Sequence, residues 1–185
     1  MAKGSGFRAN LQLLYREYGG VYAVLTSFYF WFAILISGLL WPVWNGPSEN
    51  YLGVVLSVMP ALAGFSIAGF SLVFSVLDHE TRKVLAAPAE ELGNRSPLLQ
   101  LLSSVAHAIL VQVTAILVAL VIDEKPFPSM SWFAEYVLYA NRIWAFIGFS
   151  IFLYGLALIV ATTLSIVQIV NLIYVAPSRK GGEQE

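Results

Sequence analysis

Residues 51–77 read YLGVVLSVMPALAGFSIAGFSLVFSVL, and this stretch contains no Lys, Arg, Asp or Glu. A helix of this length rises about 40 Å, which is more than the roughly 30 Å hydrocarbon core of a bilayer. Three further stretches are equally apolar and free of charge, namely residues 21–41, 98–122 and 143–174. We therefore predict an all-α, polytopic membrane protein in which four transmembrane helices form one bundle, with residues 1–185 as a single transmembrane domain.

The composition agrees with this prediction. Of the 185 residues, 58% are hydrophobic and only 11% are charged, and the mean hydropathy is +0.75. The net charge of -1 argues against a nucleic-acid partner, since such partners require a clustered basic surface. The sequence has no cysteine, so disulfides and thiolate metal sites are excluded, and no motif for a cofactor is present.

Basic residues near the ends of the four stretches predict the orientation. Eight of the ten Lys and Arg residues fall on one side of the predicted membrane: Lys3, Arg8, Arg16, Arg82, Lys83, Arg95, Arg179 and Lys180. The other side has Lys125 and Arg142. Because cytoplasmic loops carry the excess of basic residues, we expect both termini in the cytoplasm. The stretch 143–174 is longer than a bilayer requires, and we expect it to project at its cytoplasmic end.

Short amphipathic helices are predicted at both membrane surfaces. Between Gly6 and Gly19, apolar residues recur at helical spacing while Arg8, Gln12 and Arg16 take the other positions, which is typical of a helix lying on a membrane. Residues 129–141 show the same one-sided pattern on the outer side. Aromatic residues of an outer headgroup belt are expected at Trp41, Trp44, Tyr51, Trp132, Tyr136, Tyr139 and Trp144.

A row of small residues follows residues 51–77 at spacings of four and three, and we call it the small face. Its members are Ser57, Ala61, Gly64, Ala68, Ser71 and Ser75. Larger residues such as Phe65 and Leu72 take other positions on the same helix. Small residues let membrane helices approach closely. The small face therefore predicts a packing surface, either against another helix of this chain or between subunits; a pore lining is a third interpretation.

Polar residues inside the apolar stretches predict a second feature. At similar depths in the inner half of the membrane we expect a cluster of Ser104, His107, Gln112, Thr163, Ser165 and Gln168. Among Asp, Glu, Lys, Arg and His, His107 is the one residue within the four stretches, and such a group is a candidate functional residue. The cluster has two interpretations, which are hydrogen bonding between helices and a small vestibule open to the cytoplasm.

Enzymatic chemistry finds little support in these residues. Ser104 and His107 are three residues apart, but no acid to orient the imidazole and no oxyanion site accompanies them. Asp78, His79 and Glu80 form no set of metal ligands at helical spacing, and a solvated helix end explains them better. We therefore expect a protein without catalytic activity, metal or cofactor.

The segment Met59-Pro60-Ala61-Leu62-Ala63-Gly64-Phe65-Ser66-Ile67-Ala68-Gly69-Phe70, together with Ser104-Val105-Ala106-His107 and Val111-Gln112, resembles a pattern of small four-helix inner-membrane proteins of bacteria, a family of uncharacterised activity. The resemblance implies a location in the bacterial inner membrane and no activity. We expect a membrane anchor or sensor subunit that oligomerises or docks a membrane-protein partner, with lipids around it. By analogy of architecture alone, we connect it with a bacterial defence or stress system. The alternative is an oligomeric channel or small transporter with a polar vestibule in its inner half.

Overall fold

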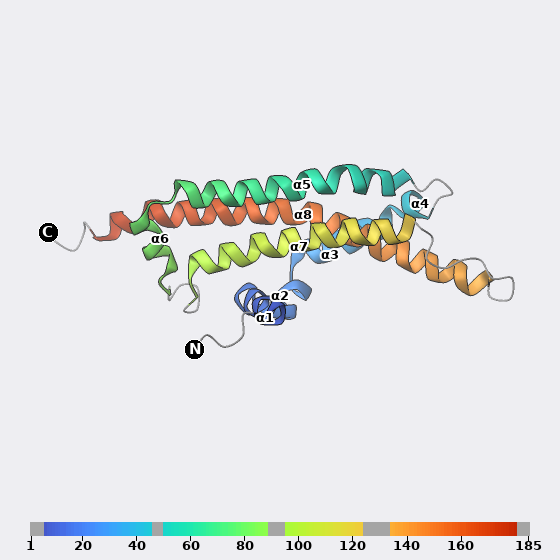
Figure 1. Ribbon diagram of the computed structural model, residues 1–185, viewed down its shortest axis with the longest axis horizontal. Coiled ribbons are helices and arrows are strands. Elements are labelled where there is room, and N and C mark those ends of the chain that lie inside the picture. The colour runs from blue at the N-terminus through green and yellow to red at the C-terminus, as the bar shows by residue number, and fades with distance from the viewer. Residues whose placement is uncertain (1–5, 46–49, 89–94, 124–133, 181–185) are drawn as a thin grey trace.

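The computed structural model describes residues 6–45, 50–88, 95–123 and 134–180. Helices in these ranges are α1 (Phe7–Tyr18), α2 (Gly20–Leu25), α3 (Phe28–Leu39), α4 (Trp41–Trp44), α5 (Asn50–Val76), α6 (His79–Ala86), α7 (Pro97–Asp123) and α8 (Ala134–Lys180). Figure 1 shows α5, α7 and α8 running along the length of the molecule. These three contain segments long and apolar enough to cross a membrane: Tyr51–Leu72, Pro97–Ile122 and Glu135–Gln168. The predicted all-helical class is confirmed, with three such helices.

Residues 21–41 do not form the single uninterrupted helix that we predicted. The chain leaves helical geometry at Ser27, which is extended with ψ of 128°, so that α3 has 12 residues and rises only about 18 Å. The break is stabilised locally, because the Thr26 hydroxyl donates to the Tyr22 carbonyl oxygen at 2.8 Å. The indole of Trp31 donates across the break to the carbonyl oxygen of Leu25 at 2.7 Å. Hydroxyl side chains that bond to nearby backbone compete with a continuous helix.

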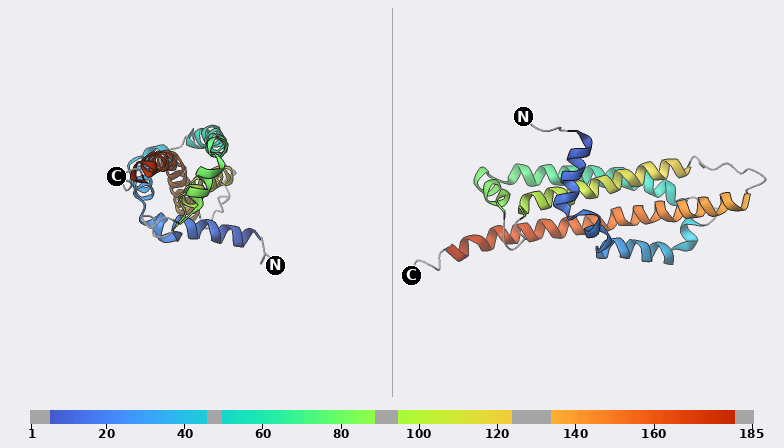
Figure 2. Two further views of the ribbon diagram at one scale, coloured as in Figure 1. Left: turned by 90° about the vertical axis from the view of Figure 1, so that its left-hand side faces the viewer. Right: turned by 90° about the horizontal axis from the view of Figure 1, so that it is seen from below.

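The amphipathic helix predicted between Gly6 and Gly19 is confirmed as α1. Its end is fixed by Gly19, with φ of 108°, and Gly20, with φ of 76°, a left-handed geometry that is strained for other residues. The two glycines let the chain turn sharply from α1 into α2. Figure 2 shows that α1 crosses the long axis of the bundle, and its described contacts are mainly with α7.

The outer helix predicted at residues 129–141 is not separate from the last span. Residues 129–133, which include Trp132, lie outside the described residues, and α8 runs without interruption from Ala134 to Lys180. Its 47 residues rise about 70 Å, more than twice the hydrocarbon core of a bilayer.

The aromatic belt is also corrected, since Trp44 and Tyr51 are 5% and 6% exposed and belong to the core. Trp41, Tyr136, Tyr139 and Trp144 are exposed, as a belt requires.

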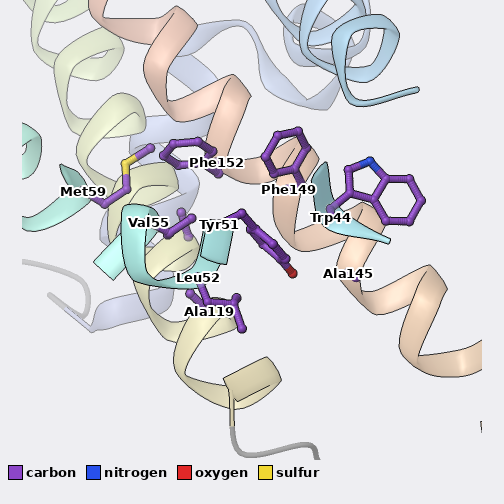
Figure 3. Close-up of a cluster of buried hydrophobic side chains, with 10 residues drawn as sticks. Trp44, Tyr51, Leu52, Val55, Met59, Ala119, Ala145, Phe149 and Phe152 are labelled. Carbon is purple, nitrogen blue, oxygen red and sulfur yellow. The ribbon is translucent and has the colours of Figure 1, made fainter. Parts of the chain in front are cut away.

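The largest hydrophobic core lies where α4, α5, α7 and α8 meet at one end of the bundle. Figure 3 shows most of its residues, which are Trp44, Tyr51, Leu52, Val55, Met59, Ala115, Ala119, Ala145, Phe149 and Phe152. The indole of Trp44 donates to the carbonyl oxygen of Ser37 at 2.7 Å, which ties α4 back onto α3. On α8, a Cβ at Gly148 would lie 2.7 Å from Ile122 Cδ1. This glycine therefore sets the close approach of α7 and α8.

Candidate functional site

His107 is the centre of a polar contact between three helices. Its imidazole is 3% exposed, and its Nε2 is 3.0 Å from the hydroxyl oxygen of Tyr154 on α8. The ring of Tyr18 on α1 packs over the imidazole, with centroids 4.3 Å apart and planes at 32°. Tyr15, one helical turn earlier on α1, meets the imidazole edge-on at 6.0 Å. The surface helix α1 is therefore attached to the bundle at a buried histidine.

The tyrosine hydroxyls extend this contact. Tyr18 and Tyr154 hydrogen-bond to each other, so Tyr154 links the α1 tyrosine with His107. Burial raises the pKa of Tyr18, because the ionised phenol loses hydration. Among the described residues, His107 Nδ1 has no hydrogen-bond partner. No described carboxylate pairs with the ring, and a charged imidazole without one would be costly in such apolar surroundings.

Gln112 forms a second polar link, one turn and a half further along α7. Its side chain is fully buried, and its Oε1 accepts a hydrogen bond from the Ser66 hydroxyl of α5 at 3.3 Å. Its amide nitrogen has no partner among the described residues. Helix α8 passes close by through Gly155, where a Cβ would lie 3.6 Å from Gln112 Cγ and 3.1 Å from Met59 Cε. Gln112 therefore joins α5 to α7 beneath a close crossing of α8.

A cavity of about 450 Å³ lies beside the first turns of α7 and the middle of α8. Three residues of the predicted cluster, Ser104, Ser165 and Gln168, line it. The other polar residues in its wall are Tyr18, Ser27, Tyr29, Gln100 and Thr162. The structure thus brings half of the predicted cluster to one cavity and adds polar groups from the first 30 residues of the chain.

The other predicted cluster residues lie elsewhere. His107 and Gln112 make the helix contacts described above, and Thr163 is exposed with its hydroxyl donating to the Ile159 carbonyl oxygen at 2.8 Å. Ser104 and His107 are not hydrogen-bonded to each other, because the Ser104 hydroxyl donates to the Gln100 carbonyl oxygen at 2.9 Å. A serine nucleophile activated by this histidine is therefore not assembled.

A short helix, α6, lies between α5 and α7. Asp78 begins α6, and its Oδ1 accepts a hydrogen bond from the Thr81 amide at 2.8 Å. This bond holds the pKa of the Asp78 carboxyl below its usual range. The helix-end interpretation of Asp78, His79 and Glu80 is thus confirmed for Asp78. Within the described residues, no group of three or more His, Asp or Glu side chains has the arrangement of a metal site.

The six residues of the small face all point away from the bundle. Each is exposed, whereas the opposite side of α5 buries Leu52, Val55 and Met59. A Cβ added at Gly64 would have no heavy atom within 4 Å. The interpretation of the small face as a packing surface within one chain is therefore wrong, because α5 contacts α7 and α8 through its other side.

Sequence reasoning did not identify Tyr15, Tyr18 and Tyr154 as partners of His107. The available signal was Tyr154 itself, since a tyrosine deep in an apolar stretch requires a partner for its hydroxyl. The other signal was the spacing of Tyr15 and Tyr18, which places both on the apolar side of α1.

No family model, no curated protein and no solved structure matches the chain. Its class therefore follows from the fold and the composition. Three helices long and apolar enough to cross a bilayer, with polar side chains paired between them, define a helical membrane protein.

Proposed function

We propose that this protein is a non-enzymatic, multi-pass membrane subunit that assembles with copies of itself, or with a membrane-protein partner, through the small face of α5. One observation carries the proposal: six small residues in a row lie on the outside of the bundle. Leucine and lipid tails are equally apolar, so helices in a membrane associate by close packing rather than by exclusion from water. A smooth row of Ser, Ala and Gly permits the closest packing.

The serines of the small face support packing rather than polar recognition. The hydroxyls of Ser57, Ser71 and Ser75 donate to carbonyl oxygens of their own helix at 3.0, 3.0 and 2.8 Å. These hydroxyls therefore need no partner from another helix. Under the proposal, the partner surface packs closely against the small face without hydrogen bonds to its serines. The simplest partner is the small face of a second copy of α5.

The membrane topology belongs to the same proposal. Helices α2 and α3 together cover Gly20 to Leu39, about 30 Å if extended end to end as helix, and we propose that they form a fourth crossing interrupted at Ser27. The distribution of Lys and Arg supports cytoplasmic termini. The resemblance noted for Met59–Phe70 supports a bacterial inner membrane, and the role as anchor or sensor of a defence or stress system rests on analogy of architecture alone.

The mass of the protein in nanodiscs tests the assembly. We expect a closed oligomer for the wild type and a shift toward monomer for Gly64→Leu, which adds a large side chain in the middle of the small face. The matched control is Thr114→Leu, which adds bulk at an exposed position of α7 and should leave the mass unchanged. Equal masses for the wild type and both variants would contradict packing through the small face.

The alternative function is an oligomeric channel or small transporter. The observation that favours it is the cavity lined by Ser104, Ser165 and Gln168, which has the polar lining that a vestibule requires. Ion flux into liposomes containing the assembled protein tests this alternative. A channel predicts flux that Ser165→Leu reduces while the oligomer persists; a sealed assembly predicts no flux in either form.

A further inference from the structure

A second surface feature lies between α3 and α8, on residues that the proposed assembly does not use. One cavity of about 380 Å³ is lined by Gly38, Trp41, Trp44, Tyr139, Arg142, Ile143 and Phe146. Another of about 210 Å³ is lined by Phe30, Ile34, Phe146, Ile147, Ser150, Ile151 and Tyr154. Phe146 belongs to the walls of both cavities, and we call the pair the α3–α8 groove.

The lining residues follow one side of each helix. On α3, the wall is formed by Phe30, Ile34 and Gly38, at intervals of four residues. Intervals of four keep side chains on the same side of a helix. On α8, the wall extends from Tyr139 to Tyr154. Figure 2 shows α3 lying beside α8 over this stretch, so the two cavities succeed one another along a single interface.

The groove is apolar along its length and carries a charge at one end. Arg142 is the one charged residue in its wall, and it forms no ion pair with any side chain in the described ranges. Trp41 and Tyr139 beside it are 48% and 52% exposed, as is typical of aromatic residues at the level of lipid headgroups. At this level the guanidinium of Arg142 lies beside the end of the groove, and its planar shape matches a phosphate with two parallel hydrogen bonds.

The length of the groove fits one lipid leaflet. From Arg142 to Tyr154, α8 advances 12 residues, or about 18 Å, and one leaflet contributes roughly 15 Å of hydrocarbon. A phosphate at Arg142 would therefore place an acyl chain along Ile143, Ile147 and Ile151 toward Tyr154. Ile143 and Ile147 are 59% and 38% exposed, so the groove is open from the lipid side.

From this geometry we infer that the α3–α8 groove binds one glycerophospholipid, with its phosphate on Arg142 and one acyl chain between α3 and α8. Gly38 lies in the wall of the groove with open space around it, because a Cβ built on it meets no heavy atom within 4 Å, so a large side chain there would occupy the groove. The site is separate from the small face and is independent of whether the chain oligomerises.

Lipid retention measured by native mass spectrometry tests this inference. The protein is reconstituted in nanodiscs containing either phosphatidylglycerol or diacylglycerol with the same acyl chains in a background of a phosphate-free glycolipid, digalactosyldiacylglycerol, then released into detergent. We expect the wild type to retain one phospholipid per chain, with diacylglycerol retained roughly tenfold less, since a charge-assisted hydrogen bond contributes about that factor. Arg142→Gln should abolish the preference for the phospholipid, and Arg142→Lys should preserve part of it.

The second arm tests the acyl chain. Gly38→Leu should reduce retention of both lipids, whereas Gly69→Leu, at a helical glycine of α5 that also has no heavy atom within 4 Å of a built Cβ, should leave both unchanged. Helical content and thermal unfolding of each variant show that the fold is intact. Unchanged retention in both Arg142→Gln and Gly38→Leu would overturn the inference, as would an equal loss in Gly69→Leu.

Discussion

The close approach of α7 and α8 at Gly148 gives the sharpest stability prediction. In Gly148→Ala, the new Cβ would lie 2.7 Å from Ile122 Cδ1 and 3.2 Å from Val118 Cγ1. Ordinary contacts between carbon atoms are about 3.5–4.0 Å, so the Ile122 methyl group must retreat by roughly 1 Å. Overpacking of this kind costs about 1–3 kcal/mol, and alanine recovers about 1 kcal/mol of helix propensity. Because Ile122 Cδ1 is the free end of a flexible, half-buried side chain, the cost lies at the low end of that range, and we expect a net loss of at most about 1 kcal/mol in the free energy of unfolding.

A double-mutant cycle separates the contact from the general effect of replacing glycine. Ile122→Val deletes the Cδ1 atom that lies closest, so it should relieve most of the cost of Gly148→Ala and give a coupling energy of about 1 kcal/mol. Gly69→Ala is the control, because a Cβ there meets nothing within 4 Å, and it should be neutral or slightly stabilising. The assay is equilibrium unfolding in mixed micelles followed by helical circular dichroism. Additive effects of the two substitutions would refute the packing argument.

The contact between α1 and the bundle yields two further predictions. Tyr154→Phe removes the hydroxyl that bonds to both His107 and Tyr18. We expect the free energy of unfolding to fall by about 1–3 kcal/mol and hydrogen exchange in α1 to become faster. Unchanged exchange in α1 would contradict the proposed link. The pKa of Tyr18 is raised in the folded protein, so this group contributes stability that is present below its unfolded pKa of about 10 and lost as pH rises through the folded value. Ultraviolet titration should show one fewer late-ionising tyrosine in Tyr18→Phe than in the wild type, with α1 of the wild type becoming sensitive to protease at the same alkaline pH.

The long helices were predictable because charge-free apolar runs of this length have few alternatives. Residues 51–77 and 98–122 match α5 and α7 closely, and the amphipathic pattern before Gly19 identified α1. The break at Ser27 was not predictable from composition, since the residues on both sides are as apolar as those of a continuous span. It depends on the Trp31 indole reaching the Leu25 carbonyl, a contact between side chain and backbone that hydropathy does not register.

The polar cluster was predicted at the wrong register. We expected His107 to lie level with Thr163, but the structure places it against Tyr154, nine residues and about 14 Å away along α8. Depth estimates require a known boundary at each helix end, and α8 exceeds any bilayer thickness, so its sequence does not specify which part lies level with His107. The pairing of Gln112 with Ser66 depends on the same relative shift between helices.

Glycine and other small residues have opposite uses in α8 and α5. In α8, Gly148 and Gly155 face α7 and α5, and a Cβ at either would come within 3.1 Å or less of a neighbouring side chain. In α5, Gly64 lies in a row of exposed small residues, and a Cβ built on it meets no heavy atom within 4 Å. If small residues were used only to bring helices of one chain together, the row in α5 would face inward, where Leu52, Val55 and Met59 lie instead. The same packing device that joins α7 and α8 is thus available on the outside of α5, and a second helix placed there would make the close contacts that lipid tails make less well.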